Sequence, residues 1–558
     1  MHNAGRGRAT TGVAVALLVA LVLGGCGGGG TVSRRSQSLG SIDINPMPRD
    51  RVRDGGTLRL PMYSMPNNFN YNQIDGTSAD TGQIDYATLP ALFTGTADGG
   101  LVINHDYLTS AELTSTNPQV VTYTLNPKAT WSDGSPLSWR DFQAYWQAQN
   151  GSNPQYQLSG STGYDDIVAV SRGVDDRQAV ITFGRPFAEW QNLFVPFQPA
   201  SLTGTPTAFN TAWRTGMPVT AGPFRVRSVD QTAQTVTLQR DPHWWGTPAK
   251  LDQVIFKVYE SAAEPDALAN NELDFYEVGS SLDLLRRAQQ TAGAVVRNAP
   301  SRAFTHLTFN GAGGAPLADL ALRRAIAQGI NRAEIARRMI GQIVPDAGPD
   351  GNHVYLPGSR QYQDNSGVLP YDPIRAGQRL DSLGWTRVGA TRQRGGVPLR
   401  LRLVTRDDPT SRDTAVTVQN QLAQLGVTVT LQVYPFNQLI YNVARGGFDL
   451  ALFAWGSTAT PFSSEVDIYG RPIGNNAREN YGRIGSAELD ALFDQGNAEF
   501  DETKRAAIGN RADRLIWQEA HSVVLFARPG TVAVRANLAN FGAWGLADWN
   551  FINAGFAR

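Results

Sequence analysis

The sequence predicts an α/β fold whose main sheet contains neighbouring parallel strands. Residues 399–403 and 427–433 alternate apolar and polar side chains as strands do. Between them, residues 412–425 have the pattern of a helix closed by Gly426. Residues 448–453 are nearly all apolar, which is typical of a strand covered on both faces in a parallel sheet. Short βαβ connections of this kind give parallel strands with right-handed crossovers.

The end of the last strand in this run is the first candidate binding site. Ligands of parallel sheets bind beyond the carboxyl ends of strands. The residues at that end are Ala454, Trp455, Gly456, Ser457 and Thr458, and we predict that they line a pocket. The alternative is that Trp455 only caps a hydrophobic core.

Length and composition narrow the function classes. A chain of 558 residues is too long for one core and predicts two or three domains. Its 49 basic residues balance its 49 acidic residues, so we predict neither a nucleic-acid-binding surface nor a polybasic patch for anionic lipids. The single cysteine excludes a disulfide framework within the chain and cysteine-rich metal sites.

The amino-terminal segment looks like a bacterial lipoprotein signal. Arg6 and Arg8 precede an apolar run from Val13 to Leu23, and a lipobox-like sequence ends at Cys26. This resemblance implies that residues 1–25 are a signal peptide and that Cys26 carries lipid, which anchors the protein outside the cytoplasmic membrane. The alternative is a single transmembrane anchor, but the apolar run falls well short of the roughly 20 residues that span a bilayer.

The segment after the lipobox is predicted to be a flexible tether. Residues 26–53 contain GGGG, SRRSQSLGS and NPMPRD, a composition that buries too little apolar surface to fold. Removal of the signal peptide takes away Arg6 and Arg8 and no acidic residue, so the mature chain is slightly acidic.

The next elements follow from alternation and turn residues. TLRLPMY, residues 57–63, predicts a strand, and the polar and aromatic residues 67–73 form a loop at its end. LPALFT, residues 89–94, has the character of a buried helix or turn. Residues 120–125 predict a strand, which leads through a turn at residues 132–134 into a helix.

Capping residues mark several helices. Ser138 is placed to cap the helix after the turn, whose tryptophans we assign to the core rather than to a ligand. Asn331 and Glu334 begin another helix as an N-cap and its partner. Asp372 begins a third helix, and Gly384 ends it.

The sequence contains no catalytic constellation that we recognise. Motifs of serine hydrolases, zinc proteases, phosphate loops and EF-hands do not occur, and GAGGAP at Gly311 has Pro316 where a dinucleotide loop needs glycine. The six histidines lack ligand spacing, so a metal site would have to be assembled from distant residues. We therefore predict a protein that is not an enzyme and that uses no cofactor or metal.

Several strings recur in an order that resembles one family. The longest is YTLNPKATWSDGSPLSWRDF at Tyr123, with a strand end, an aromatic residue, an Asp-Gly-x-Pro turn and a helix start. The others are GGTLRL at Gly55, AGPFRV at Ala221, VTLQRDPHWWG at Val236, NNELDF at Asn270 and FNGAGGAPLADLALRRAIAQGINR at Phe309. Together they resemble the extracellular solute-binding proteins of family 5, the oligopeptide-, dipeptide- and nickel-binding lipoproteins of ABC importers. The resemblance covers roughly residues 54–558.

The resemblance implies a two-lobed clamshell of the periplasmic-binding-protein type II class, in the large form with an inserted subdomain. Lobe I would contain residues 54–92, 206–308 and 521–558, with residues 93–205 inserted as the subdomain, and lobe II would contain residues 309–520. The hinge would then cross near Phe309 and His521. A ligand between two lobes can be buried almost completely, and closure is a signal that a permease can detect.

The resemblance also implies a function. The protein would be the substrate-binding lipoprotein of an ABC importer that captures short peptides or peptide-like solutes and delivers them to the permease and ATPase complex. The main chain near Ala454 to Ser457 can hydrogen-bond an extended peptide. Besides the strand end, the expected ligand contacts are Asn68, Phe69, Asn70, Phe309, Asn310 and Tyr481.

The sequence leaves two alternatives to the import function and allows predictions of oligomeric state and location. An envelope lipoprotein of the same fold would bind a cell-envelope lipid, glycan or protein and act in regulation. An extracellular hydrolase is the weakest hypothesis, because the sequence offers no nucleophile, base or metal. We expect a monomer that is lipid-anchored on the extracytoplasmic side, in a periplasm or on a cell surface.

One residue departs from the family pattern. In the oligopeptide-binding relatives, an aspartate three residues after the strand's tryptophan binds the ammonium group of the peptide, whereas this chain has Thr458. A charge-assisted hydrogen bond contributes about 1.5–3 kcal/mol, so the difference matters for affinity. Either a more distant acid such as Glu465 or Asp467 takes the role, or the ligand has no free amine there, which is the reading we favour.

Overall fold

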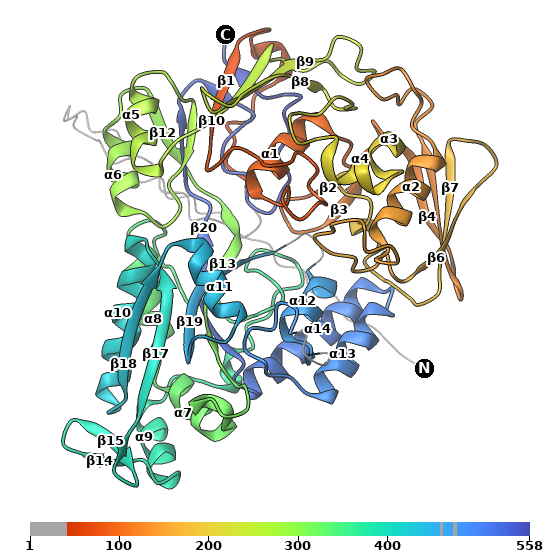
Figure 1. The fold of residues 1–558 in the computed structure, drawn as a ribbon. Helices are drawn as coiled ribbons and strands as arrows, with labels where there is room; N and C mark the ends of the chain where they lie inside the picture. Colours follow the sequence, from red (N-terminus) through yellow and green to blue (C-terminus); the bar gives the residue numbers. More distant parts are fainter. Residues whose placement is uncertain (1–41, 458–460, 473–476) are drawn as a thin grey trace, which may run out of the picture. The chain divides into compact units, whose positions relative to one another are not determined.

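The predicted parallel strands lie in a five-stranded sheet of order β18-β17-β19-β13-β20 (Figure 1). The computed structural model describes residues 42–457, 461–472 and 477–558. The strands of this sheet are β13 (Pro300–Phe309), β17 (Arg400–Arg406), β18 (Thr428–Tyr434), β19 (Leu450–Gly456) and β20 (Ser522–Pro529). β17 is parallel to β18 and β19, which confirms the prediction, and β13 is antiparallel to β19 and β20. The crossovers are α10 (Pro409–Gln424) and α11 (Phe436–Ala444).

β19 is the buried strand that its composition predicts. It lies between β17 and β13 in the sheet. Leu450, Ala451 and Leu452 are almost fully buried, because the strand has a partner on each side and its side chains enter two hydrophobic clusters. Exposure rises only from Ala454 onward, at the carboxyl end.

The hinge expected near Phe309 and His521 remains a prediction, and the strands that flank these residues both lie in the five-stranded sheet. Residues 300–309 and 522–529, which the resemblance assigned largely to lobe I, are strands β13 and β20 of the lobe II sheet. Phe304 and Phe526 belong to the same core as β17 and β19. Because both strands are hydrogen-bonded into this sheet, we place the crossings at their far ends, at Pro300 and Pro529.

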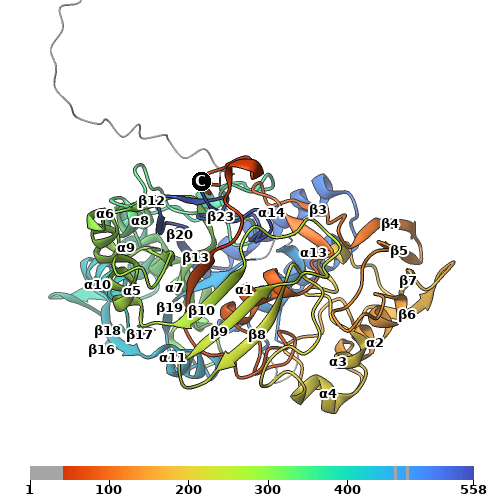
Figure 2. The same cartoon turned by 90° about the horizontal axis from the view of Figure 1, so that it is seen from above.

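Two four-stranded sheets lie in the first part of the chain, with the orders β1-β10-β9-β8 and β4-β5-β7-β6. In Figure 2 β10, β9 and β8 lie side by side. The strands of the two sheets are β1 (Thr57–Met62), β4 (Leu108–Thr116), β5 (Gln119–Leu125), β6 (Ile167–Arg172), β7 (Gln178–Phe183), β8 (Phe224–Asp230), β9 (Thr235–Arg240) and β10 (Gln253–Val258). A single hydrophobic cluster contains Leu58, Tyr123 and Val236, so the predicted inserted subdomain shares a core with the rest of lobe I.

The remaining strands form sheets of two or three strands. They are β2-β3, β11-β21-β12, β14-β15-β16 and β22-β23. Their bounds are β2 (Phe93–Gly95), β3 (Leu101–Ile103), β11 (Phe275–Glu277), β12 (Ala294–Arg297), β14 (Thr386–Val388), β15 (Thr391–Arg394), β16 (Val397–Pro398), β21 (Val532–Arg535), β22 (Leu538–Ala539) and β23 (Gly555–Phe556). The helix or turn expected over residues 89–94 is only partly correct, because Phe93 and Thr94 pair with β3 as strand β2.

The helices begin at the capping residues that the sequence indicates. Ser138 and Asp141 form a capping box, and Asn331 accepts the backbone N–H of Glu334. The Asp372 side chain accepts the backbone N–H of Arg375 at the start of α9. The remaining α-helices are α1 (Ala79–Thr88), α2 (Trp139–Gln149), α3 (Ala200–Thr203), α4 (Pro206–Thr211), α5 (Glu264–Ala269), α6 (Leu282–Gln290), α7 (Leu320–Gln328), α8 (Arg332–Ile340), α9 (Pro373–Ser382), α12 (Phe462–Tyr469), α13 (Ala487–Asn497) and α14 (Glu502–Gln518).

The predicted tether is wrong for its last residues, because residues 43–53 pack against the end of the chain. Asp43 forms a β-bridge with Ala543, and Val52 forms one with Ala557. Val52 is fully buried. The folded body therefore begins about ten residues before the expected boundary, because apolar side chains within a polar segment find partners at the carboxyl terminus.

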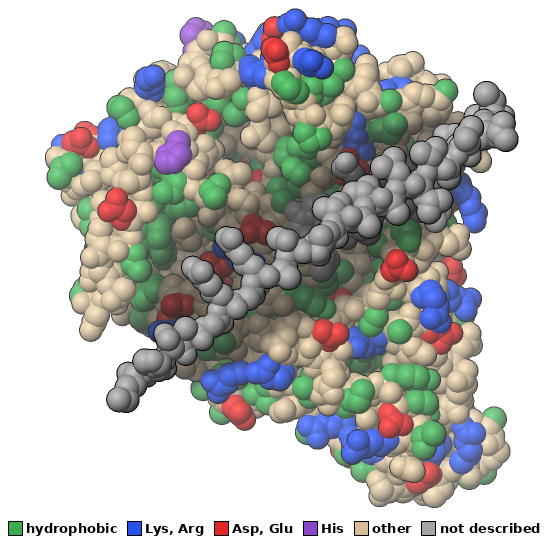
Figure 3. Space-filling model, turned by 180° about the vertical axis from the view of Figure 1, so that it is seen from behind, with side chains coloured by type: hydrophobic (Ala, Val, Ile, Leu, Met, Phe, Trp, Pro, Cys, Tyr) green, Lys and Arg blue, Asp and Glu red, His purple; other side chains and the backbone are tan. Residues whose placement is uncertain are grey.

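Two predicted residues of special interest, Cys26 and Thr458, lie outside the described residues. Within the described part of the chain, no helix combines the length and apolar character that a membrane crossing requires. On the face that Figure 3 shows, the described basic and acidic side chains are interspersed, in keeping with the balanced charge of the sequence.

Candidate functional site

A cavity of about 630 Å³ is the main candidate site among the described residues. Its wall is built from helix α1, from the loop of residues 191–196, from the start of β13 and from residues 529–532 and 542–549. Volumes of roughly 300–1,000 Å³ are typical of sites for small ligands. Ser457, at the end of β19, also belongs to the wall, so the predicted strand end does reach the cavity.

The wall is rich in aromatic rings and contains four charged residues among those described. The rings are those of Tyr71, Tyr86, Phe93, Phe275, Trp544 and Trp549. The charged residues are Asp85, Glu277, Arg302 and Asp548. A largely apolar surface with a few charged groups at fixed places is the usual composition of a specific binding site.

Arg302 and Asp548 neutralise one another. An Arg302 Nη2 lies 2.8 Å from Asp548 Oδ1, and the guanidinium also donates to the backbone oxygen of Leu546. Asp548 accepts the Gly95 backbone N–H at 2.6 Å and the Tyr86 hydroxyl at 3.2 Å. The hydrogen-bonding groups of this pair are largely used within the protein. The pair therefore stabilises the cavity wall and has little capacity left to bind a charged ligand.

The other two acids are in different environments. Glu277, at the end of β11, accepts the Tyr63 hydroxyl at 3.2 Å. Asp85, on α1, exposes 4% of its surface, and neither of its oxygens has a hydrogen-bond partner. Burial raises the pKa of Asp85 well above its usual value.

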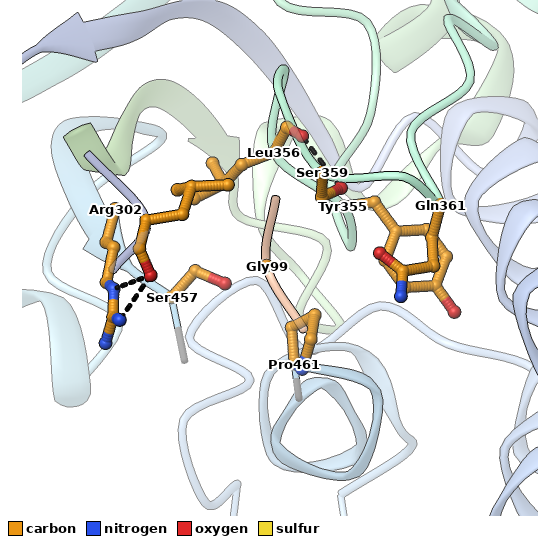
Figure 4. Close-up of a pocket in the computed structure, with 9 residues that line it drawn as sticks. Gly99, Arg302, Tyr355, Leu356, Ser359, Gln361, Ser457 and Pro461 are labelled. Atoms are coloured by element: carbon orange, nitrogen blue, oxygen red, sulfur yellow. Dashed lines mark hydrogen bonds between the residues drawn. The ribbon is translucent and has the colours of Figure 1, made fainter. Parts of the chain in front are cut away.

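A smaller pocket adjoins the strand end (Figure 4). Gly99, Tyr355, Ser359 and Pro461 line it together with Arg302 and Ser457. In Figure 4 the guanidinium of Arg302 turns toward the backbone oxygen that it binds, beside Ser457. The Ser457 backbone N–H donates to the Arg302 backbone oxygen at 2.6 Å, so β19 ends in contact with the start of β13.

Trp455 packs in an aromatic stack and does not line the cavity. Its ring is stacked on His306 at 5.9 Å and on Tyr481 at 5.7 Å between centroids, and Phe453 meets it edge-on. Trp455 is partly buried and packs against the core in this structure, and its role in binding stays a prediction. Ala454 is half-buried and Gly456 is exposed, and neither appears in the cavity wall.

The other predicted contacts are buried in the framework. Asn68 and Asn70 donate to the backbone oxygens of residues 210 and 209, and Phe69 is fully buried. Asn310 donates to the backbone oxygens of Gly446 and Phe448. Phe309 is fully buried in the lobe II core. Phe309 and Asn310 lie at the end of β13, and residues 68–70 lie in the loop after β1. The side chains of the three asparagines hold loops.

The two acids considered as substitutes for the missing aspartate are also engaged or enclosed. Asp467 pairs with Arg478 at 3.0 Å and accepts the Thr162 hydroxyl at 3.2 Å. Glu465 is buried in α12, and burial raises its pKa well above the usual range. Neither lines the cavity. Sequence reasoning missed Asp85, since a single aspartate within a short helix carries no pattern.

Residues of the inserted subdomain contact lobe II near α12. Glu189 accepts the backbone N–H of Ser463 at 2.8 Å and that of Phe462 at 3.3 Å, at the first turn of the helix. The Ala188 backbone N–H donates to the Asn497 oxygen at 2.7 Å. Burial raises the pKa of Glu189, while its bonds to Ser463 act in the opposite direction.

Metal chemistry finds no support in the described residues. Across residues 42–457, 461–472 and 477–558, no three His, Cys, Asp or Glu side chains are grouped as metal ligands. His306 has two buried ring nitrogens without hydrogen-bond partners, and His353 is paired with Asp513 at 2.7 Å. The buried histidines are therefore part of the packing.

Comparisons with known proteins identify a family of similar chains. The family model described as bacterial extracellular solute-binding proteins, family 5 Middle, matches residues 103–476. The oligopeptide-binding protein OppA of Mycobacterium tuberculosis (strain ATCC 25618 / H37Rv) is 43% identical over 553 residues, which cover 97% of this chain and 93% of the relative.

Solved structures extend the comparison to the fold. A periplasmic EDTA-binding protein, EppA, aligns with a TM-score of 0.85 at 24% identity, over 94% of this chain and all of that chain. The oligopeptide-binding protein AppA of Bacillus subtilis, solved with a nonapeptide, aligns with a TM-score of 0.72 at 17% identity, over 91% of this chain and 100% of that chain. At these identities the likeness shows the fold.

Proposed function

The chain belongs to the bacterial extracellular solute-binding proteins of family 5, and on that premise we propose that it captures short peptides and delivers them to an ABC permease. The observation that carries the proposal is the cavity of about 630 Å³, with aromatic rings in its wall and the end of β19 at its side. A relative that spans 97% of this chain is named an oligopeptide-binding protein, which favours peptide import over the regulatory alternative. Binding and release without catalysis are part of this proposal.

Ligand-linked closure is the first expected result. An equimolar pool of pentapeptides should reduce the radius of gyration in X-ray scattering, because a ligand that binds the closed form shifts the equilibrium toward it. It should also raise the melting temperature, since ligand at about 100 times its Kd stabilises by about 2.7 kcal/mol. Native mass spectrometry of the same samples identifies the bound peptides. Absence of binding from every peptide in the pool contradicts the proposed function.

Lipid anchoring is a separate part of the proposal. The variant Cys26→Ala should fold normally and leave the membrane fraction, because the balanced surface charge offers no second anchor and each buried CH₂ of a lipid contributes about 0.8 kcal/mol. Immunoblots of membrane and soluble fractions measure the distribution. Full retention of Cys26→Ala in the membrane fraction contradicts the anchor.

A further inference from the structure

Two acidic side chains of the cavity wall lie outside its ion pair. Of the four charged residues in its described wall, Arg302 and Asp548 form an ion pair, which leaves Asp85 and Glu277. Burial raises the pKa of Glu277, while the hydrogen bond from the Tyr63 hydroxyl and the charge of Arg528 act in the opposite direction. Asp85 alone has no hydrogen-bond partner for either oxygen.

The position of Asp85 on α1 brings it to the cavity. Ser78, Gly82, Asp85 and Leu89 follow one another at helical spacing, and all four belong to the wall. Gly82 has no side chain, and the ring of Tyr71 packs against this position, 3.5 Å from where a Cβ would lie. Both oxygens of Asp85 are covered in this structure, so contact with a ligand would require the side chain to rotate.

A second acid on the same helix shows how a structural carboxylate is satisfied. Asp80 accepts the backbone N–H groups of Tyr63 and Ser64, at 2.9 and 3.1 Å. Asp85 has no comparable bonds, although it is buried to a similar extent. An unpaired carboxylate in such a place disfavours the unliganded protein, and a cation that pairs with it removes the penalty.

The surroundings of Asp85 suit a cation. Tyr71 and Tyr86 lie in the wall close to it along the chain, and Trp544 and Trp549 form another part of the wall. Aromatic faces attract ammonium groups through their ring quadrupoles, so rings and a carboxylate together favour a positively charged ligand group.

We propose that Asp85 binds the ammonium group at the amino terminus of a peptide ligand. This inference rests on the proposed function, because it names the group of the peptide that the cavity recognises. It differs from the expectation that Thr458 raised, namely a ligand without a free amine. The acid comes from helix α1 of lobe I and not from the end of β19.

The test compares one pentapeptide pool in two forms, with free amino termini and N-acetylated, in competition for the same protein. The wild type should prefer the free-amine pool at least tenfold by native mass spectrometry, since a hydrogen bond to a charged group contributes about tenfold to hundredfold in affinity. Asp85→Asn should reduce the preference below threefold. The same substitution should leave the melting temperature of the ligand-free protein equal or higher, because no partner of the carboxylate is lost.

Asp80→Asn is the matched control on the same helix. It should lower the melting temperature, because it removes a partner of the Tyr63 and Ser64 N–H groups, and it should keep the free-amine preference. The inference is overturned if the wild type shows no preference for the free amine, or if Asp85→Asn keeps it. It is also overturned if Asp85→Asn destabilises the ligand-free protein and weakens both pools equally. If neither pool binds the wild type, the proposed function fails, and this inference fails with it.

Discussion

Between pH 7.5 and pH 4.5, the free energy of unfolding should fall by about 3 kcal/mol less in His306→Phe than in the wild type. Burial, with a smaller contribution from His353, lowers the pKa of His306 from 6.5 to about 3. Below pH 6.5 the unfolded chain takes up a proton at this residue, and the folded protein does so only near pH 3. Stability is therefore complete above pH 6.5 and falls as the pH falls toward 3. The full loss corresponds to about 5 kcal/mol.

Phenylalanine suits the site because the imidazole lies among aromatic rings. The ring centroids of His306 and Phe453 are 4.3 Å apart, and both imidazole nitrogens lack partners. Urea unfolding at the two pH values, followed by tryptophan fluorescence, gives the difference between the proteins, in which titrating groups that do not interact with His306 cancel. His243→Phe is the control, since the His243 side chain is 84% exposed. Parallel pH curves for the wild type and His306→Phe contradict the assignment.

Glu189→Ala should weaken peptide binding tenfold to hundredfold without changing any residue of the cavity wall. In this structure the carboxylate joins the inserted subdomain to the first turn of α12 in lobe II. If these groups separate when the lobes open, the two backbone N–H groups of α12 return to water and the contact stabilises only the closed form. A hydrogen bond to a charged group contributes about 1.5–3 kcal/mol, which is the basis of the expected factor.

Calorimetry with a peptide from the bound pool measures the change in affinity, and X-ray scattering measures the fraction of closed protein. Glu189→Gln should have a smaller effect, because an amide oxygen still accepts one of the N–H groups. Glu112→Ala, at an exposed acid of β4 in the same subdomain, should have no effect. Equal affinities for the wild type and Glu189→Ala would show that the contact is present in open and closed forms alike.

The sequence predicted the central sheet well because its signals are local. The apolar run of β19, the alternation of β17 and β18 and the caps of α2, α8 and α9 each depend on residues close together in the chain. The pairing of β13 with β20 could not be predicted from the sequence, because 212 or more residues separate the paired positions and no local pattern marks the two strands as partners.

The site could be predicted only in part, for a similar physical reason. The end of β19 was identified, and Ser457 lies in the cavity wall. Asn310 follows β13 directly and Asn70 lies in the loop after β1, but whether an amide faces a ligand or a neighbouring backbone oxygen depends on loops far away in the sequence. Asp85 is recognisable only when its lack of partners is seen in three dimensions.

The pairing of residues 43–53 with the carboxyl terminus brings the two ends of the folded body together, so the protein should tolerate circular permutation. The Arg558 backbone N–H donates to the Arg51 oxygen at 3.1 Å, beside the bridge between Val52 and Ala557. Ends that touch can be joined by a short linker, and a new start and finish can be placed at an exposed turn such as Gly395–Gly396, between β15 and β16. In such a circular permutant the lobes keep their contacts, while the point from which the chain can be tethered moves to the hairpin between β15 and β16.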